Sequence, residues 1–129
     1  MQVKADGIHL PQFMLPKLPW IRKKHPKWII TTATHDFKSV KLASSLKSDY
    51  ILISPIFKTA SHPNTKPKSL YGLSLYKKIS KNICPLGGIN QMNIKLLSGL
   101  VSKKELKKYI KITLAGSVNP TYNKFKLSN

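Results

Sequence analysis

The sequence is poor in acids, arginine and cysteine, and it has no long apolar run. Four acidic residues stand against 23 basic ones among 129, so the formal net charge is +19. The single cysteine, Cys84, cannot form an internal disulfide. No stretch approaches the roughly 20 apolar residues of a membrane-spanning helix. The first ten residues include Asp6 and do not resemble a secretory signal. We therefore expect a cytoplasmic protein with no membrane partner.

The excess of lysine permits two interpretations. A strongly basic surface attracts polyanions such as RNA, or draws in an anionic substrate. Proteins that read phosphate often use arginine, whose planar guanidinium binds phosphate in a bidentate way, and this chain has only Arg22. The lysines are also dispersed along the chain. We interpret the charge as compositional drift and do not expect a nucleic-acid partner, but a basic nucleic-acid-binding module remains the alternative.

Short apolar runs alternate with helical patterns along most of the chain. The predicted strands are residues 7–10, 28–33, 50–54, 83–86 and 112–115. Predicted helices cover residues 36–48, 72–81 and 102–109, with Asp36 as a helix cap, and a further one follows Asn90. Residues 13–27 contain three prolines, so there we expect a connection with at most one helical turn. The alternation predicts an α/β fold with a parallel sheet.

Polar and glycine-rich segments follow three of these strands. The run at residues 50–53 opens after Pro55 into a polar loop, and glycine pairs or Gly-Ser turns follow the next two strands, at Gly87-Gly88 and Gly116-Ser117. Bare backbone N–H groups at glycine suit phosphate, and a (β/α)₈ barrel binds phosphate after its seventh and eighth strands. We therefore predict a partial (β/α)₈ TIM barrel over residues 1–118, corresponding to barrel strands 4–8, followed by a polar tail at residues 119–129.

Four segments in order resemble one family. Residues 5–12 (ADGIHLPQ) and 49–57 (DYILISPIF) are similar to the fourth and sixth strands of thiamine phosphate synthase and its relatives. Residues 59–63 (TASHP) resemble the loop of a variant branch, and residues 85–89 (PLGGI) resemble the phosphate turn. The superfamily also contains thiazole tautomerases, which carry a histidine where this chain has Ser54-Pro55. The resemblance is therefore to the synthase branch, in the carboxyl-terminal part of its barrel.

The resemblance implies a transferase of thiamine biosynthesis that joins a pyrimidine diphosphate to a thiazole phosphate and releases pyrophosphate. In such enzymes Mg²⁺ assists ionisation of the diphosphate. The substrate-binding residues carry over by position in three groups. Those implied for the thiazole phosphate are Thr59, Ser61, Gly88, Gly116 and Ser117. Gln12 would lie near the pyrimidine diphosphate, and His62 stands in place of the lysine that usually contacts pyrophosphate. His35 either braces its helix or touches ligand.

The expected Mg²⁺ ligands are absent from this chain. The family motif that supplies one aspartate would precede Met1, and the position of the second is Met14. We assign no catalytic residue and no metal ligand, and we expect that this chain alone does not ionise a diphosphate. A non-catalytic, regulatory relative that binds thiazole phosphate is the alternative. Five βα-type units leave two open sheet edges, so we expect a truncated product or a fragment that self-associates or needs a complementing chain.

Overall fold

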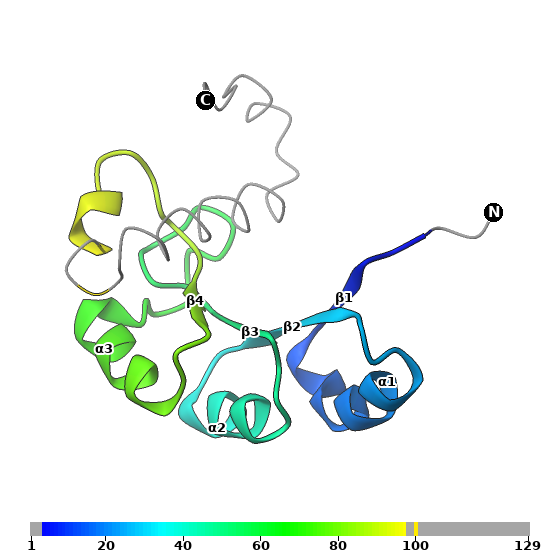
Figure 1. Ribbon diagram of the computed structural model, residues 1–129. Coiled ribbons are helices and arrows are strands. Elements are labelled where there is room, and N and C mark those ends of the chain that lie inside the picture. The colour runs from blue at the N-terminus through cyan, green and yellow to red at the C-terminus, as the bar shows by residue number, and fades with distance from the viewer. Residues whose placement is uncertain (1–3, 98–99, 101–129) are drawn as a thin grey trace. The chain divides into compact units, whose positions relative to one another are not determined.

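The computed structural model describes residues 4–97 and residue 100. It has the expected α/β fold, with four parallel strands in one sheet in the order β1-β2-β3-β4 (Figure 1). The strands are β1 (Gly7–Leu10), β2 (Ile29–Thr34), β3 (Tyr50–Ile53) and β4 (Ile83–Pro85). Neighbouring strands follow one another in the sequence, as consecutive strands of a (β/α)₈ barrel do.

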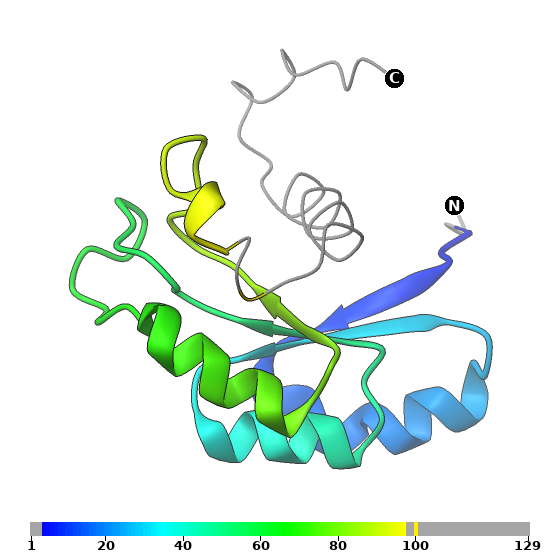
Figure 2. The ribbon, with the colours of Figure 1, turned by 60° about the vertical axis from the view of Figure 1, so that its left-hand side comes forward.

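Helices connect each strand to the next and cover one face of the sheet (Figure 2). They are η1 (Gln12–Lys17), α1 (Leu18–Lys24), α2 (Phe37–Ser45) and α3 (Ser69–Ile79). The chain divides into two units, residues 1–90 and 91–129, and the second contains the 3-10 helix η2 (Ile94–Leu97). The predicted helix at 102–109, the strand at 112–115 and the tail lie outside the described residues. Within the described part of the chain, no helix has the length and apolar character needed to cross a bilayer.

The expectation of a largely irregular connection at residues 13–27 is wrong. A 3-10 helix and an α-helix fill it. Pro19 lies in the first turn of α1, where its missing N–H group has no intrahelical partner, and Pro16 lies in the preceding 3-10 helix. Pro26 follows the end of α1. The prolines therefore sit where helices tolerate them.

The predicted cap of α2 is present. The Asp36 carboxylate accepts a hydrogen bond from the Ser39 N–H group, and the Ser39 hydroxyl reaches back to the Asp36 backbone in a capping box. The helix ends at Ser45, earlier than the predicted residue 48. Lys47 has a left-handed backbone with φ of 59°, and such a residue commonly ends a helix.

The core lies between the sheet and its helices. Leu10, Leu18, Ile21 and Ile30 form a buried cluster, and exposure alternates along β2 from Ile29 to Thr34. Ile29 itself, on the opposite face of the sheet, is 50% exposed. The helix-covered face therefore carries the hydrophobic core, as alternation along a strand requires.

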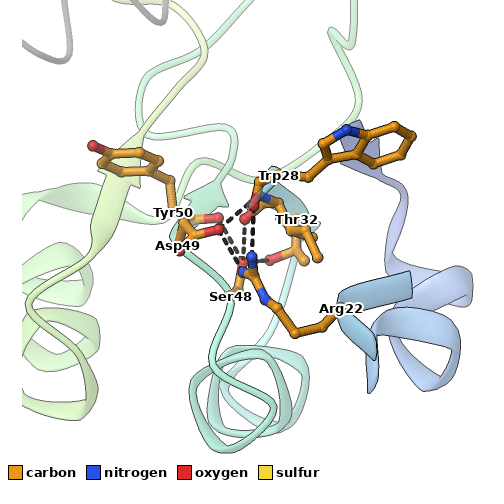
Figure 3. A network of polar contacts seen from close by, with 7 residues as sticks. Arg22, Trp28, Thr32, Ser48, Asp49 and Tyr50 are labelled. Atoms are coloured by element: carbon orange, nitrogen blue, oxygen red, sulfur yellow. Dashed lines mark hydrogen bonds and ion pairs between the residues drawn. The ribbon is translucent and has the colours of Figure 1, made fainter. Parts of the chain in front are cut away.

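A polar network joins the strands at their amino ends (Figure 3). The Arg22 guanidinium donates to the Trp28 carbonyl oxygen at 2.5 Å and to the Asp49 carboxylate at 2.6 Å. The same Asp49 oxygen accepts the Ile30 N–H group at 2.7 Å. The Ser48 hydroxyl, which is buried, bonds the Tyr50 carbonyl oxygen at 2.8 Å. Side chains thus tie α1, β2 and the start of β3 together.

Candidate functional site

Gln12 links the loops that follow β1 and β2. Its Nε2 group donates to Oδ2 of Asp36 at 3.1 Å, and its Oε1 atom accepts the His35 N–H group at 2.9 Å. The two ends of one amide are therefore bound to neighbouring residues at the start of α2. This fixes the orientation of the Gln12 side chain at the carboxyl ends of the strands.

Asp36 carries the negative charge of this cluster. Its Oδ1 atom accepts the Ser39 N–H group at 2.7 Å. This backbone hydrogen bond is the largest cause of the lowered pKa of Asp36, and bonds from the Gln12 and Ser39 side chains lower the pKa further. Asp36 therefore stays ionised well below neutral pH, and it couples the helix cap to Gln12.

His35 connects the end of β2 with the end of β3. Its Nδ1 atom lies 3.3 Å from the carbonyl oxygen of Ser54. A carbonyl oxygen only accepts hydrogen bonds, so Nδ1 carries the hydrogen of this contact. Ser54 precedes Pro55 through a cis peptide bond. A line of polar contacts therefore crosses the carboxyl ends of three neighbouring strands, from Gln12 through His35 to Ser54.

The glycine turn after β4 packs against the loop after β3. The N–H groups of Ile56 and Phe57 donate to the carbonyl oxygens of Leu86 and Gly87 at 2.9 and 3.1 Å. A Cβ atom at Gly88 would lie 2.6 Å from the backbone oxygen of Lys58. Both glycines have positive φ, 92° at Gly87 and 67° at Gly88. Glycine is therefore required here by the close approach of the loop backbone as well as by the turn.

Thr59 stands at the junction of this turn and the polar loop. Its methyl group would lie 3.5 Å from a Cβ atom at Gly87. Its hydroxyl accepts the His62 N–H group at 3.1 Å, and the His62 carbonyl oxygen accepts the Thr65 N–H group at 3.1 Å. The Thr59 side chain thus shapes the loop that presents His62. Ser61 and His62 are both exposed.

The structure brings only part of the predicted binding set together. Thr59 lies against the turn of Gly87 and Gly88, whereas Gln12 lies with Asp36 at the ends of β1 and β2. Gly116 and Ser117 lie outside the described residues. The coupling of Gln12 to His35 and Asp36 was missed, because the sequence indicated only a helix cap at Asp36 and no partner for it.

The described residues do not by themselves form a cluster that could hold Mg²⁺. Among them no group of three or more His, Cys, Asp and Glu side chains lies close enough to hold a metal ion. Met14, which the resemblance places at the position of a family aspartate, packs against the buried core cluster, and a thioether is a poor ligand for a hard cation. Asp49, at the amino ends of the strands, is bound by Arg22.

Comparisons with known proteins agree on one family. The family model described as thiamine monophosphate synthase matches residues 1–101. The chain is 36% identical over 97 residues to the putative thiamine-phosphate synthase 2 of Aquifex aeolicus, covering 74% of this chain and 52% of that protein. It is 30% identical over 121 residues to the thiamine-phosphate synthase of Coprothermobacter proteolyticus, covering 82% and 56%. The chain therefore spans about half the length of these curated relatives.

A solved structure supports the fold. The thiamine phosphate pyrophosphorylase from Pyrococcus furiosus aligns with a TM-score of 0.60 over 84% of this chain and 59% of that chain. The sequence identity in this alignment is 20%, so the likeness concerns the arrangement of strands and helices. It matches the parallel, sequentially ordered sheet described above.

Proposed function

Because this chain belongs to the thiamine monophosphate synthase family, we propose that it binds a phosphorylated thiazole at the carboxyl ends of β3 and β4. The resemblance implies that this compound is the acceptor which synthases join to a pyrimidine diphosphate. The described residues supply no carboxylate set for Mg²⁺. We therefore expect ligand binding by this chain alone, and synthesis of thiamine phosphate only where such carboxylates come from elsewhere.

The packing of the glycine turn against residues 55–59 carries this proposal. It holds Thr59 beside Gly87, and Thr59 in turn shapes the loop of Ser61 and His62 through its hydroxyl. Hydroxyl groups and glycine backbone are the usual components of a phosphate site at strand ends. The net charge of +19 further favours the approach of an anion.

Calorimetric titration with thiazole phosphate tests the proposal. Ser61→Ala should weaken binding about 10-fold, because a hydrogen bond to a charged oxygen contributes roughly 1.5 kcal/mol. Ser74→Ala is the matched control, since the Ser74 hydroxyl bonds the Tyr71 carbonyl oxygen within α3 and should leave binding unchanged. Failure of the wild-type chain to bind thiazole phosphate would refute the proposal.

An activity assay with Mg²⁺ tests the second part of the proposal. Thiazole phosphate and the pyrimidine diphosphate are supplied together, and thiamine phosphate is measured. We expect no turnover by the chain alone. Robust turnover would show that residues outside the described set complete the site or that other groups replace the carboxylates.

We also propose that β1 pairs with a further strand beyond the described residues. The Asp6 carbonyl oxygen accepts the Ile29 N–H group at 3.0 Å, and Gly7 is the register partner of Ile29. In a parallel ladder this directs the backbone groups of Ile8 toward β2 and those of Gly7 and His9 away from it. An open edge of this kind is a template for another strand, supplied by self-association or by a complementing chain.

Light scattering coupled to size-exclusion chromatography tests this pairing. The chain should elute as an oligomer, or form a complex with the amino-terminal half of a relative. His9→Pro should weaken association because it removes an edge N–H group while the groups that face β2 remain. His9→Ala retains that N–H group and serves as the control. A stable monomer that binds no added half would refute the pairing.

A further inference from the structure

We propose that His35 is an additional substrate-contacting residue, whose Nε2 atom bonds an oxygen of the phosphate or pyrophosphate group. The inference rests on the proposed function, and it decides for ligand contact at a residue that the sequence left open between bracing its helix and touching ligand. It also joins two sets of residues that the sequence left separate, the Gln12 cluster and the Thr59 loop.

The backbone and ring of His35 are both held. Its N–H group donates to Oε1 of Gln12 at 2.9 Å and lies 3.3 Å from the Ser39 hydroxyl oxygen. Its Nδ1 atom donates to the Ser54 carbonyl oxygen at 3.3 Å. Two contacts therefore hold the backbone N–H group and one holds the ring, each from a different element, although the residue itself is exposed. Such preorganisation is what a ligand-contacting side chain needs.

The hydrogen bond at Nδ1 assigns the other ring nitrogen. When Nδ1 carries the hydrogen of a neutral imidazole, Nε2 has a free lone pair and accepts a hydrogen bond or a proton. Among the described residues Nε2 has no hydrogen-bond partner. Once protonated, the same atom donates to an anionic oxygen while Nδ1 keeps its contact with Ser54. Binding an anion thus requires no rearrangement of the ring.

The position of His35 fits an anionic ligand. Ser54, its partner, is joined to Pro55, and the Pro55 Cα atom would lie 2.9 Å from a Cβ atom at Gly87. His35 therefore borders the strand whose loop packs on the proposed phosphate turn. The residues bound to its backbone and ring, Gln12, Ser39 and Ser54, are neutral, and Asp36, the next residue in the chain, has its carboxylate bound to Ser39 and Gln12. An imidazolium group here would supply positive charge where no Mg²⁺ ligand set is found among the described residues.

A purely structural role for His35 would use only Nδ1, the ring nitrogen that does not face the ligand in this proposal. The contact of Nδ1 with Ser54 braces β2 against β3 with or without a ligand, so the two roles can be separated by substitution. In His35→Asn the side-chain amide N–H group lies near the place of Nδ1 and can still reach Ser54, but nothing occupies the place of Nε2. His35→Ala removes both. His25→Asn is the matched control, because the His25 ring stacks on Trp28 at 3.7 Å and also belongs to the loop after α1.

The experiment combines titration with ¹⁵N NMR of the histidine rings. The probes are inorganic pyrophosphate and thiazole phosphate. We expect the free chain to show His35 protonated at Nδ1, and each bound probe to shift the Nε2 resonance. His35→Asn should weaken binding about 10-fold without changing the unfolding midpoint. His25→Asn should leave the affinity unchanged.

Three results would overturn the inference. A neutral His35 ring that carries its only hydrogen at Nε2 in the free chain would contradict the geometry directly. Wild-type affinity in His35→Asn, together with weakened binding in Ser61→Ala, would leave the proposed function intact and reduce His35 to a brace. Absence of any binding by the wild-type chain would overturn both the proposed function and this inference.

Discussion

The two ends of the sheet join their strands by different kinds of contact. At the amino ends, the Arg22–Asp49 ion pair is partly buried, and both side chains also bind backbone groups, the Trp28 carbonyl oxygen and the Ile30 N–H group. At the carboxyl ends, exposed hydrogen bonds run from Gln12 through His35 to Ser54. The first network closes on itself, whereas in the second the Nε2 atom of His35 has no hydrogen-bond partner among the described residues.

This difference agrees with the different roles of the two ends of the strands in barrel proteins. Groups at the amino ends of parallel strands contribute mainly to stability, and groups at the carboxyl ends form the binding site. The glycine turn is the exception, since it lies at the carboxyl end but is tightly packed against Lys58 and Phe57. Substitutions at the two ends should therefore separate stability from binding, except at this turn.

The largest effect is expected at the exception. Gly88→Ala should lower the free energy of unfolding by about 3 kcal/mol, because φ is 67° and the new Cβ atom would lie 2.6 Å from a backbone oxygen. It should also impair binding of thiazole phosphate. Urea unfolding measures the first effect. Gly72→Ala is the control, because the nearest atom to its new Cβ would lie at 3.6 Å, and it should be neutral or slightly stabilising. Equal losses of unfolding free energy in both variants would contradict the explanation by close packing at Gly88.

A smaller loss of stability is expected at the amino ends. Asp49→Ala should lower the free energy of unfolding by about 2 kcal/mol, because Arg22 loses its carboxylate partner and the Ile30 N–H group loses its acceptor. Affinity for thiazole phosphate should stay unchanged in calorimetry. Asp6→Ala is the control, since only the Asp6 backbone oxygen takes part in the sheet. Weakened ligand binding in Asp49→Ala would break the contrast between the two ends.

At the carboxyl ends the helix cap should matter less. Asp36→Ala should cost about 1 kcal/mol, the usual effect of losing an N-cap. The pKa of Asp36 is lowered in the folded protein, chiefly by the Ser39 backbone N–H group. Its ionised form therefore contributes stability above the ordinary value of 3.8, and this contribution is lost as the pH falls through the lower folded pKa. Asp36→Asn keeps a side-chain acceptor for the Ser39 N–H group, so its free energy of unfolding should fall less than that of Asp36→Ala. Urea unfolding of both variants and wild type at pH 7 and pH 3 measures these differences.

The smallest effect concerns His9, on β1. Partial burial of the ring lowers the pKa of His9 below its ordinary value of 6.5, and its Nδ1 atom shares a hydrogen bond of 2.8 Å with the Thr31 hydroxyl. The neutral ring contributes stability that is complete above pH 6.5 and declines as the pH falls through the folded pKa. We expect wild type to lose slightly more stability than His9→Ala between pH 7.5 and pH 5. An equal loss of unfolding free energy in wild type and His9→Ala over this pH range would contradict this expectation.

Local patterns predicted most elements and missed one region. The strands from Tyr50 and from Ile83 begin where the apolar runs begin, and Asp36 caps its helix, because these features depend on neighbours in the sequence. The helices at residues 12–24 were missed because the effect of proline depends on its position within a helix. Pro19 at the first turn of α1 permits the helix that the same residue would disrupt farther along.

The sequence by itself determined the family, the parallel α/β fold, the basic charge and the segments that follow the strands. The tertiary structure decided which of these segments meet. Gln12 and His35 are 23 residues apart and His35 and Ser54 are 19 apart. No local pattern therefore indicates their contacts or which ring nitrogen of His35 bonds Ser54. The glycine turn likewise suggested a phosphate site from sequence. Only the packed chain shows that loop backbone occupies the space a side chain would need.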